Sequence, residues 1–202
     1  MTVTRERFEQ GMTLEAFKAQ MTRNRERFEE NERTLEIAPA DLQKFKQLPQ
    51  TLHVLVLAED WCGDVINNLP ILGRLAEASG KLNLRIFLRD QNLDLMDQYL
   101  NEGQYRSIPV FVFFDEDFRE LGHWIERPAS ITAKQREALA ELYATAPELQ
   151  GIAPGTSPGQ MPEAARNRIM RFYSEFRAAH RAESDAQVVR ELWEIAAKAA
   201  QR

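Results

Sequence analysis

The sequence predicts an α/β fold in which a central mixed sheet is flanked by helices. Between residues 52 and 88 an apolar strand, a helix and a second strand follow one another. This order requires a right-handed crossover and a parallel pair of strands. After residue 109, two strand-like runs joined by three acidic residues are typical of an antiparallel hairpin. A sheet that contains both kinds of pairing is mixed.

The bulk composition is that of an ordinary soluble protein. The chain has 202 residues, enough for one sizeable domain with an appendage, and 44% of them are apolar. A net charge of −5 gives no electrostatic reason to expect nucleic acid or a membrane surface as a partner. The first ten residues are charged and lack an apolar core, so we expect neither a secretory signal nor a spanning helix. We therefore expect a cytoplasmic protein, in which a lone thiol stays reduced.

Residues 1–38 are predicted to form an N-terminal helical extension. Thr13 is a suitable N-cap for a first helix. The spacing would place four apolar side chains on one face of this single helix: Leu14, Phe17, Met21 and Phe28. A second, short helix is expected to begin near Pro39, because proline is tolerated at the first helical position, and Pro49 should end it.

The first strand should be central in the sheet. Residues 52–58 are apolar apart from His53, which is typical of a strand covered on both faces. A helix from Asp64 to about Ser79 follows, and Gly80 fits the left-handed position just after a helix end. The next strand alternates apolar with charged residues, namely Leu84, Ile86 and Leu88 with Arg85 and Arg89.

The second half of the core is predicted as a helix, a hairpin and a closing helix. An apolar-rich helix should run from about residue 93 to Gly103, and the hairpin should pair residues 110–114 with 119–125. Thr132 is expected to cap a further helix that completes the cover of the sheet. Its inward-facing side chains would be Leu139, Leu142 and Tyr143.

The last part of the chain should be a linker and a helical hairpin. Residues 147–162 hold four prolines and three glycines, so we expect a linker or an ordered loop there. Residues 163–202 carry two amphipathic stripes, and Ser184 with Gln187 resembles a capping box for the second helix. The two helices would fold back onto the core or pair with a second subunit. The predicted domains are 1–38, 39–146, 147–162 and 163–202.

The segment from Leu52 to Pro70 resembles the active-site segment of the thioredoxin family. An apolar strand passes through Trp61 and Cys62 into a helix, as in the family's Trp-Cys-x-x-Cys turn, and Pro70 stands where thioredoxins carry a kink proline. The run around Pro109 is similar to the segment in which the family keeps a cis proline facing the cysteine, and an X-Pro bond adopts cis at modest cost. The resemblance covers about residues 40 to 146 and implies a thioredoxin-like fold.

The chain departs from this pattern at the position of the second cysteine. That position holds Val65, and Cys62 is the only cysteine, so no intramolecular disulfide can form. The buried acid that the family places six residues before its first cysteine is replaced by Val56. The start of a helix favours the thiolate of Cys62, whereas Asp64 and two acidic residues before the turn oppose it. We therefore expect a slow or specialised thiol.

Several neighbours of Cys62 are further candidate site residues: Trp61, Gly63, Asp64, Val65, Ile108 and Pro109. Trp61 would pack beside the sulfur or lie half-buried in the core. Arg106 is a candidate to bind a carboxylate of glutathione or of an acidic partner, with a solvated surface arginine as the alternative. The three histidines show no ligand spacing, so no metal site is predicted.

Two functions of different classes fit these residues. In the first, Cys62 alone carries out thiol–disulfide exchange with a client protein or with glutathione as co-substrate, and an external thiol resolves the mixed disulfide. In the second, a redox-inactive thioredoxin-like module holds a peptide or protein partner between the Trp61–Cys62 turn and Pro109. Neither function needs a resident cofactor. Whether the chain is an enzyme, and whether it is a monomer or a homodimer, stay open at this point.

Overall fold

The computed structural model describes residues 3–201, which divide into two compact units. The first unit, here the sheet unit, combines the chain up to Arg127 with the residues from Asp185 onward. The second, here the helical unit, consists of Pro128–Ser184. The hairpin predicted for residues 163–202 is therefore shared between the two units.

The sheet unit is built on four strands: β1 (Leu52–Ala58), β2 (Leu82–Leu88), β3 (Val110–Phe114) and β4 (Glu120–Ile125). Their order is β2-β1-β3-β4, with β1 parallel to β2 and antiparallel to β3, and β3 antiparallel to β4. The predicted mixed sheet is thus confirmed. The two central strands are almost wholly buried, as expected for strands covered on both faces.

Three helices of the sheet unit pack around one face of the sheet: α4 (Pro39–Lys46), α5 (Gly63–Ser79) and α9 (Arg181–Ala196). Helix α4 begins at Pro39, and α5 ends at Gly80 in the left-handed conformation (φ +62°), both as predicted. Residues of α9 from Asp185 onward join the core of this unit. The indole Nε1 of Trp124 on β4 donates to Glu191 Oε2 at 2.7 Å, which fixes α9 to the sheet.

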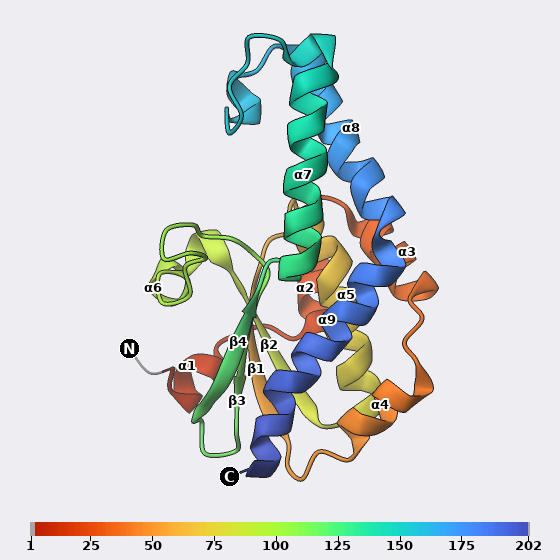
Figure 1. Ribbon diagram of the computed structural model, residues 1–202. Helices are drawn as coiled ribbons and strands as arrows, with labels where there is room; N and C mark the ends of the chain where they lie inside the picture. The colour runs from red at the N-terminus through yellow and green to blue at the C-terminus, as the bar shows by residue number, and fades with distance from the viewer. Residues whose placement is uncertain (1–2, 202) are drawn as a thin grey trace. The chain divides into compact units, whose positions relative to one another are not determined.

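On the opposite face the structure describes short elements: α1 (Arg5–Glu9), the 3₁₀ turn Arg89–Gln91 and α6 (Leu93–Met96). Figure 1 shows α1 and α6 across the sheet from α5 and α9. The ring of Phe8 on α1 meets His53 of β1 edge-on at 5.3 Å. The helix predicted as far as Gly103 is wrong beyond Met96. The chain instead forms a tight turn in which Asn101 pairs with Tyr105 and both Glu102 and Gly103 have positive φ.

The prediction of one helix that carries both Leu14 and Phe28 is wrong, because two helices occupy the segment: α2 (Leu14–Gln20) and α3 (Arg25–Thr34). The predicted cap is confirmed, since Thr13 Oγ1 accepts the N–H of Ala16 at 3.2 Å. The chain breaks between the helices because Asp60, just before Cys62, accepts the backbone N–H of Thr22 at 2.8 Å. Asn24 in turn donates to the Asp60 carbonyl at 2.8 Å. The helical extension is therefore tied to the turn that carries the cysteine.

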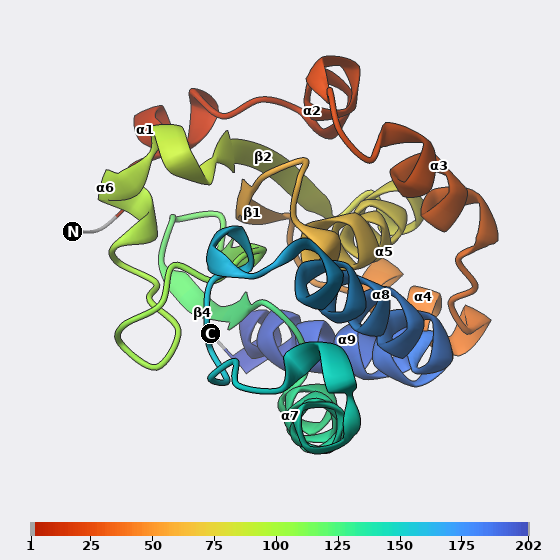
Figure 2. The same cartoon turned by 90° about the horizontal axis from the view of Figure 1, so that it is seen from above.

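Helix α5 contains Pro70, whose ring nitrogen cannot donate to the carbonyl of Ile66 one turn earlier. Asn31 of the neighbouring helix α3 supplies the missing bond, because its Nδ2 donates to Ile66 O at 2.9 Å. The Asn31 side chain is buried. Figure 2 shows α3 lying beside α5.

The helical unit has a core of its own, formed between α7 (Ala129–Thr145), α8 (Glu163–Ala179) and the loop with its two 3₁₀ turns, Pro147–Leu149 and Pro158–Gln160. Thr132 is not a cap, because α7 begins at Ala129 after Pro128. Leu142 is buried as predicted, but against α8 and not as part of the core around the sheet. Ser184 is not a cap either, because its N–H already donates to His180 O inside α9. Among the described residues, none of the helices is long and apolar enough to cross a membrane.

Candidate functional site

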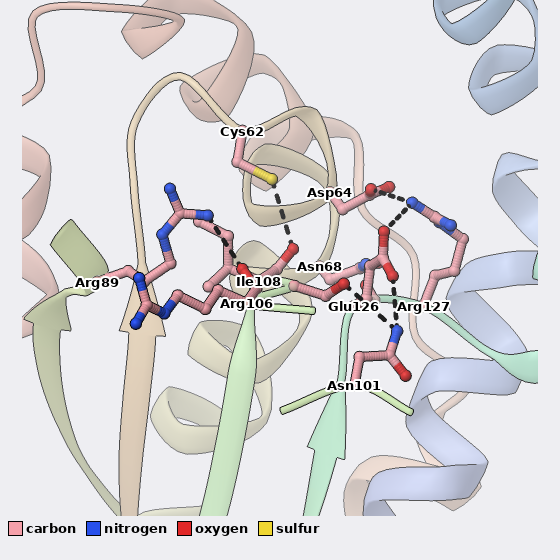
Figure 3. Close-up of polar contacts among 10 residues, drawn as sticks. Cys62, Asp64, Asn68, Arg89, Asn101, Arg106, Ile108, Glu126 and Arg127 are labelled. Carbon is pink, nitrogen blue, oxygen red and sulfur yellow. Dashed lines mark hydrogen bonds and ion pairs between the residues drawn. The ribbon is translucent and has the colours of Figure 1, made fainter. Parts of the chain in front are cut away.

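Cys62 lies at the junction of β1 and α5, where it is the N-cap residue of the helix. Its side chain is half-buried, and the sulfur donates to the backbone carbonyl of Ile108 at 3.4 Å. The Ile108–Pro109 peptide bond is cis. Figure 3 shows the sulfur facing this carbonyl, so the turn and the proline segment, which are far apart in sequence, form one site.

The surroundings of Cys62 favour the thiol over the thiolate. Burial raises its pKa most, and the nearby Asp64 carboxylate raises it further. The backbone N–H groups of Val65 and Asp64 favour the thiolate, but they do not balance these effects, and the thiol pKa reaches about 11. The start of a helix by itself would lower this pKa, but burial and the charge of Asp64 outweigh that effect here.

Trp61 lies at the surface beside the cysteine. With 41% of its surface exposed it is not a core aromatic. The guanidinium of Arg89 lies over the indole ring at 4.8 Å and also donates to the carbonyl of Arg106 at 3.0 Å. Arg89 thus holds the Trp61 ring against the segment that leads to Pro109.

The position that a second cysteine would occupy is chemically inert. Val65 is completely buried in the first turn of α5, and Gly63 is the first residue of that helix. No other residue of the chain can supply the second thiol, because Cys62 is the only cysteine. Any resolving thiol must come from another molecule.

Arg106 is already paired within the chain. Its side chain forms two hydrogen bonds with Asp97, from Nε at 2.7 Å and from Nη2 at 3.0 Å. Both side chains are about half exposed. The structure therefore places the Arg106 guanidinium at the rim of the site, where it is already paired with the carboxylate of Asp97.

A charged cluster that the sequence analysis missed lies on the other side of Cys62 (Figure 3). Arg127 donates to Asp64 Oδ2 at 2.6 Å and also bonds the carboxylate of Glu126. The second oxygen of that carboxylate accepts from Asn101 at 3.1 Å. Arg127 and Asp64 are each only 14% exposed, so this ion pair is largely withdrawn from water.

Glu126 joins three segments through its backbone as well. Its N–H donates to the carbonyl of Pro109 at 2.7 Å, and its carbonyl accepts from Asn68 of α5 at 2.9 Å. Its φ of +64° is uncommon for a residue with a side chain. The only signal in the sequence is the charged pair that directly follows the last strand, which by itself is typical of a solvated turn.

Glu59 is a further acid near the turn, and it is structural. It is 8% exposed, and its Oε1 accepts the backbone N–H of Asp90 at 2.9 Å, which joins the ends of β1 and β2. Burial raises the pKa of Glu59. Across the residues that the structure describes, no three histidine, cysteine or acidic side chains form a group that could hold a metal ion.

The mixed sheet, the turn with Cys62 at the start of α5 and the cis proline opposite it define a thioredoxin-fold protein with one cysteine. A thioredoxin family model matches residues 11–139, more than half of the chain, and the protein belongs to the thioredoxin family.

Two solved structures share the fold. One is a Pseudomonas aeruginosa protein of unknown function, 24% identical, with a TM-score of 0.61 over 71% of this chain and 89% of its own. The other is an HIV epitope scaffold, 16% identical, with a TM-score of 0.63 over 93% of both chains. No curated protein matches the sequence.

Proposed function

We propose that this protein is a thioredoxin-fold binding module in which Cys62 remains a thiol. The observation that carries the proposal is the state of that sulfur, which donates to the Ile108 carbonyl and has a pKa raised to about 11. At pH 7 such a thiol is ionised in only about one molecule in ten thousand. Since the thiolate is the nucleophile in disulfide exchange, the resting site is poorly suited to that reaction.

The segment before the cis proline supports binding of an extended chain. Within residues 3–201, the backbone N–H of Ile108 has no hydrogen-bond partner. Ile108 is only 3% exposed, but it closely follows the exposed residues 102–106. An unpaired backbone group next to an exposed segment can bond to the main chain of an added peptide. The exposed indole of Trp61 next to it offers a large apolar contact of the kind that contributes most to protein interfaces.

Monothiol exchange with glutathione or a client protein is the second candidate function. One observation favours it: the sulfur lies at the start of α5, where the N–H groups of Asp64 and Val65 stabilise a thiolate once it forms. A partner that displaced the Ile108 carbonyl from the sulfur would leave these two N–H groups in place. The two functions differ in whether binding depends on the sulfur.

The test uses a displayed library of random peptides, selected on the wild-type protein and on Cys62→Ser under reducing conditions. We expect cysteine-free peptides whose Kd for the two proteins agrees within about twofold. Trp61→Ala should weaken them about tenfold, the loss of one aromatic interface contact. Met170→Ala, which removes an exposed apolar side chain in the helical unit, is the matched control and should change nothing.

Intact mass measurement after incubation with glutathione disulfide completes the test. Binding that required Cys62, together with rapid formation of a glutathione adduct at pH 7, would replace the binding module with monothiol exchange. Equal binding by the serine variant and slow adduct formation would support the binding module.

A further inference from the structure

Asp64 has an unusual orientation for an acid in the first turn of a helix. A carboxylate there ordinarily faces the free N–H groups or the solvent. Asp64 is instead only 14% exposed, and its Oδ2 accepts from Arg127 at 2.6 Å. Arg127 comes from the chain directly after β4, so a contact between distant segments determines where this carboxylate lies.

We propose that Asp64 keeps Cys62 in its thiol form and that Arg127 is the positioning residue that fixes the Asp64 carboxylate beside the sulfur. This inference rests on the proposed function, in which Cys62 remains a thiol, and it assigns to two residues the part of that state that burial of the sulfur does not account for. Neither residue touches a substrate in the proposal. Both act through the cysteine.

The charges that face the sulfur come from two elements. Asp64 lies on α5, while Glu126 and Arg127 follow β4. Both carboxylates oppose ionisation of Cys62, whereas the guanidinium of Arg127 favours it. Arg89 and Arg106 lie on the far side of the sulfur (Figure 3). They are paired with Asp90 and Asp97, respectively. The cluster around Arg127 has a net negative charge, because two carboxylates share one cation. The acids before the turn, Glu59 and Asp60, instead accept the backbone N–H groups of Asp90 and Thr22.

The rest of the cluster explains why Arg127 holds a single position. The Arg127 guanidinium also donates to the carboxylate of Glu126. Asn101 in turn donates to the second oxygen of that carboxylate at 3.1 Å. Asn68 and Pro109 bond the Glu126 backbone. The carboxylate of Asp64 is thus held by a chain of contacts that also includes the loop of the cis proline.

The first experiment measures the rate of Cys62 alkylation by iodoacetamide against pH in Asp64→Asn. Removing the nearby charge should lower the thiol pKa by about one unit. At pH 7 alkylation should then be about threefold faster, because tenfold more thiolate is partly offset by its weaker nucleophilicity. The variant should fold, since Arg127 keeps Glu126 as its partner.

Asp97→Asn is the matched control, because it also removes a carboxylate paired with an arginine, on the other side of the site. It should leave the pH profile unchanged. An unchanged profile in Asp64→Asn, or an equal shift in Asp97→Asn, would overturn the assignment of Asp64.

The role of Arg127 is tested by coupling. In an Arg127→Gln background the carboxylate loses its anchor, so Asp64→Asn should shift the pKa by less than half as much as in the wild type. Arg127→Lys, which retains the charge, should restore part of the effect. Equal shifts in both backgrounds would overturn the positioning role. A wild-type pKa near the ordinary 8.5 would instead reject the proposed function, while the differences among variants would still test this inference.

Discussion

Helix α5 contains two polar contacts that differ in kind. In its middle, Asn31 donates to the carbonyl that Pro70 leaves free, and both partners are neutral and satisfied. In its first turn, Asp64 is paired with Arg127 in a cluster with two acids and one base, next to a half-buried sulfur. The neutral contact repairs a helix, whereas the charged one leaves a net charge close to a reactive atom. Polar groups of one helix can thus serve the fold at one turn and the chemistry at another.

Breaking the middle contact should give the larger effect on stability. Asn31→Leu leaves the carbonyl of Ile66 buried without a donor, and we expect unfolding free energy to fall by about 2 kcal/mol. Urea unfolding followed by circular dichroism measures the loss. The alkylation rate of Cys62 should stay within experimental error of the wild type.

Asn67→Ala is the control for this prediction. Asn67 Oδ1 is the second acceptor of Asn31, at 3.2 Å, and its removal leaves the bond to Ile66 intact. The loss should be below about 0.5 kcal/mol. A loss as large as that of Asn31→Leu would show that the side-chain pair, and not the free carbonyl, is the important contact.

The thiol of Cys62, at the start of α5, should instead make the stability of the protein depend on alkaline pH. The pKa of the folded-state thiol is raised to about 11, so between the ordinary value and 11 the folded protein binds more protons than the unfolded chain. Stability present below about pH 8.5 is then lost as the pH rises toward 11. We expect a loss of about 1 kcal/mol from this group, since partial exposure to solvent weakens the effect.

Cys62→Ser isolates that loss from other alkaline titrations. The difference in urea midpoint between wild type and variant should be constant below pH 8 and should change in favour of the variant above pH 9. A difference that stayed constant up to pH 11 would contradict the raised pKa of Cys62. The polar contact in the first turn of α5 would then, like the one in the middle, serve the fold alone.

Local patterns in the sequence were sufficient to predict the framework of this fold. The apolar run of β1, the capping glycine Gly80 and the N-terminal proline Pro39 each act through their own backbone preferences, so their elements begin and end as expected. The pattern after Thr132 predicts the closing helix only loosely, because any amphipathic helix of suitable length could cover the sheet. Only the packed core shows that α9 does so.

The charged part of the site could not be predicted for a related reason. Arg127 and Asp64 are separated by 63 positions, and neither has a pattern of apolar neighbours that marks it as buried. Their pairing depends on the end of β4 lying next to the start of α5. Cys62 and Pro109 could be recognised because each resembles a family motif, whereas the charges that control the sulfur belong to no motif in this sequence.

A double-mutant cycle sharpens the comparison at the kink, with an expected effect no larger than the alkaline loss. In Pro70→Ala the residue regains an N–H that can donate to Ile66 O within the helix. The cost of Asn31→Leu should then fall by about 1 kcal/mol relative to the wild-type background. The contact of Asn31 with Ile66 would in that case be a repair of the proline, and α5 would hold a replaceable hydrogen bond at its middle. If the cost stayed the same in both backgrounds, Asn31 would stabilise the interface of α3 and α5 independently of the kink, and the middle of the helix would depend on tertiary contacts as much as its first turn does.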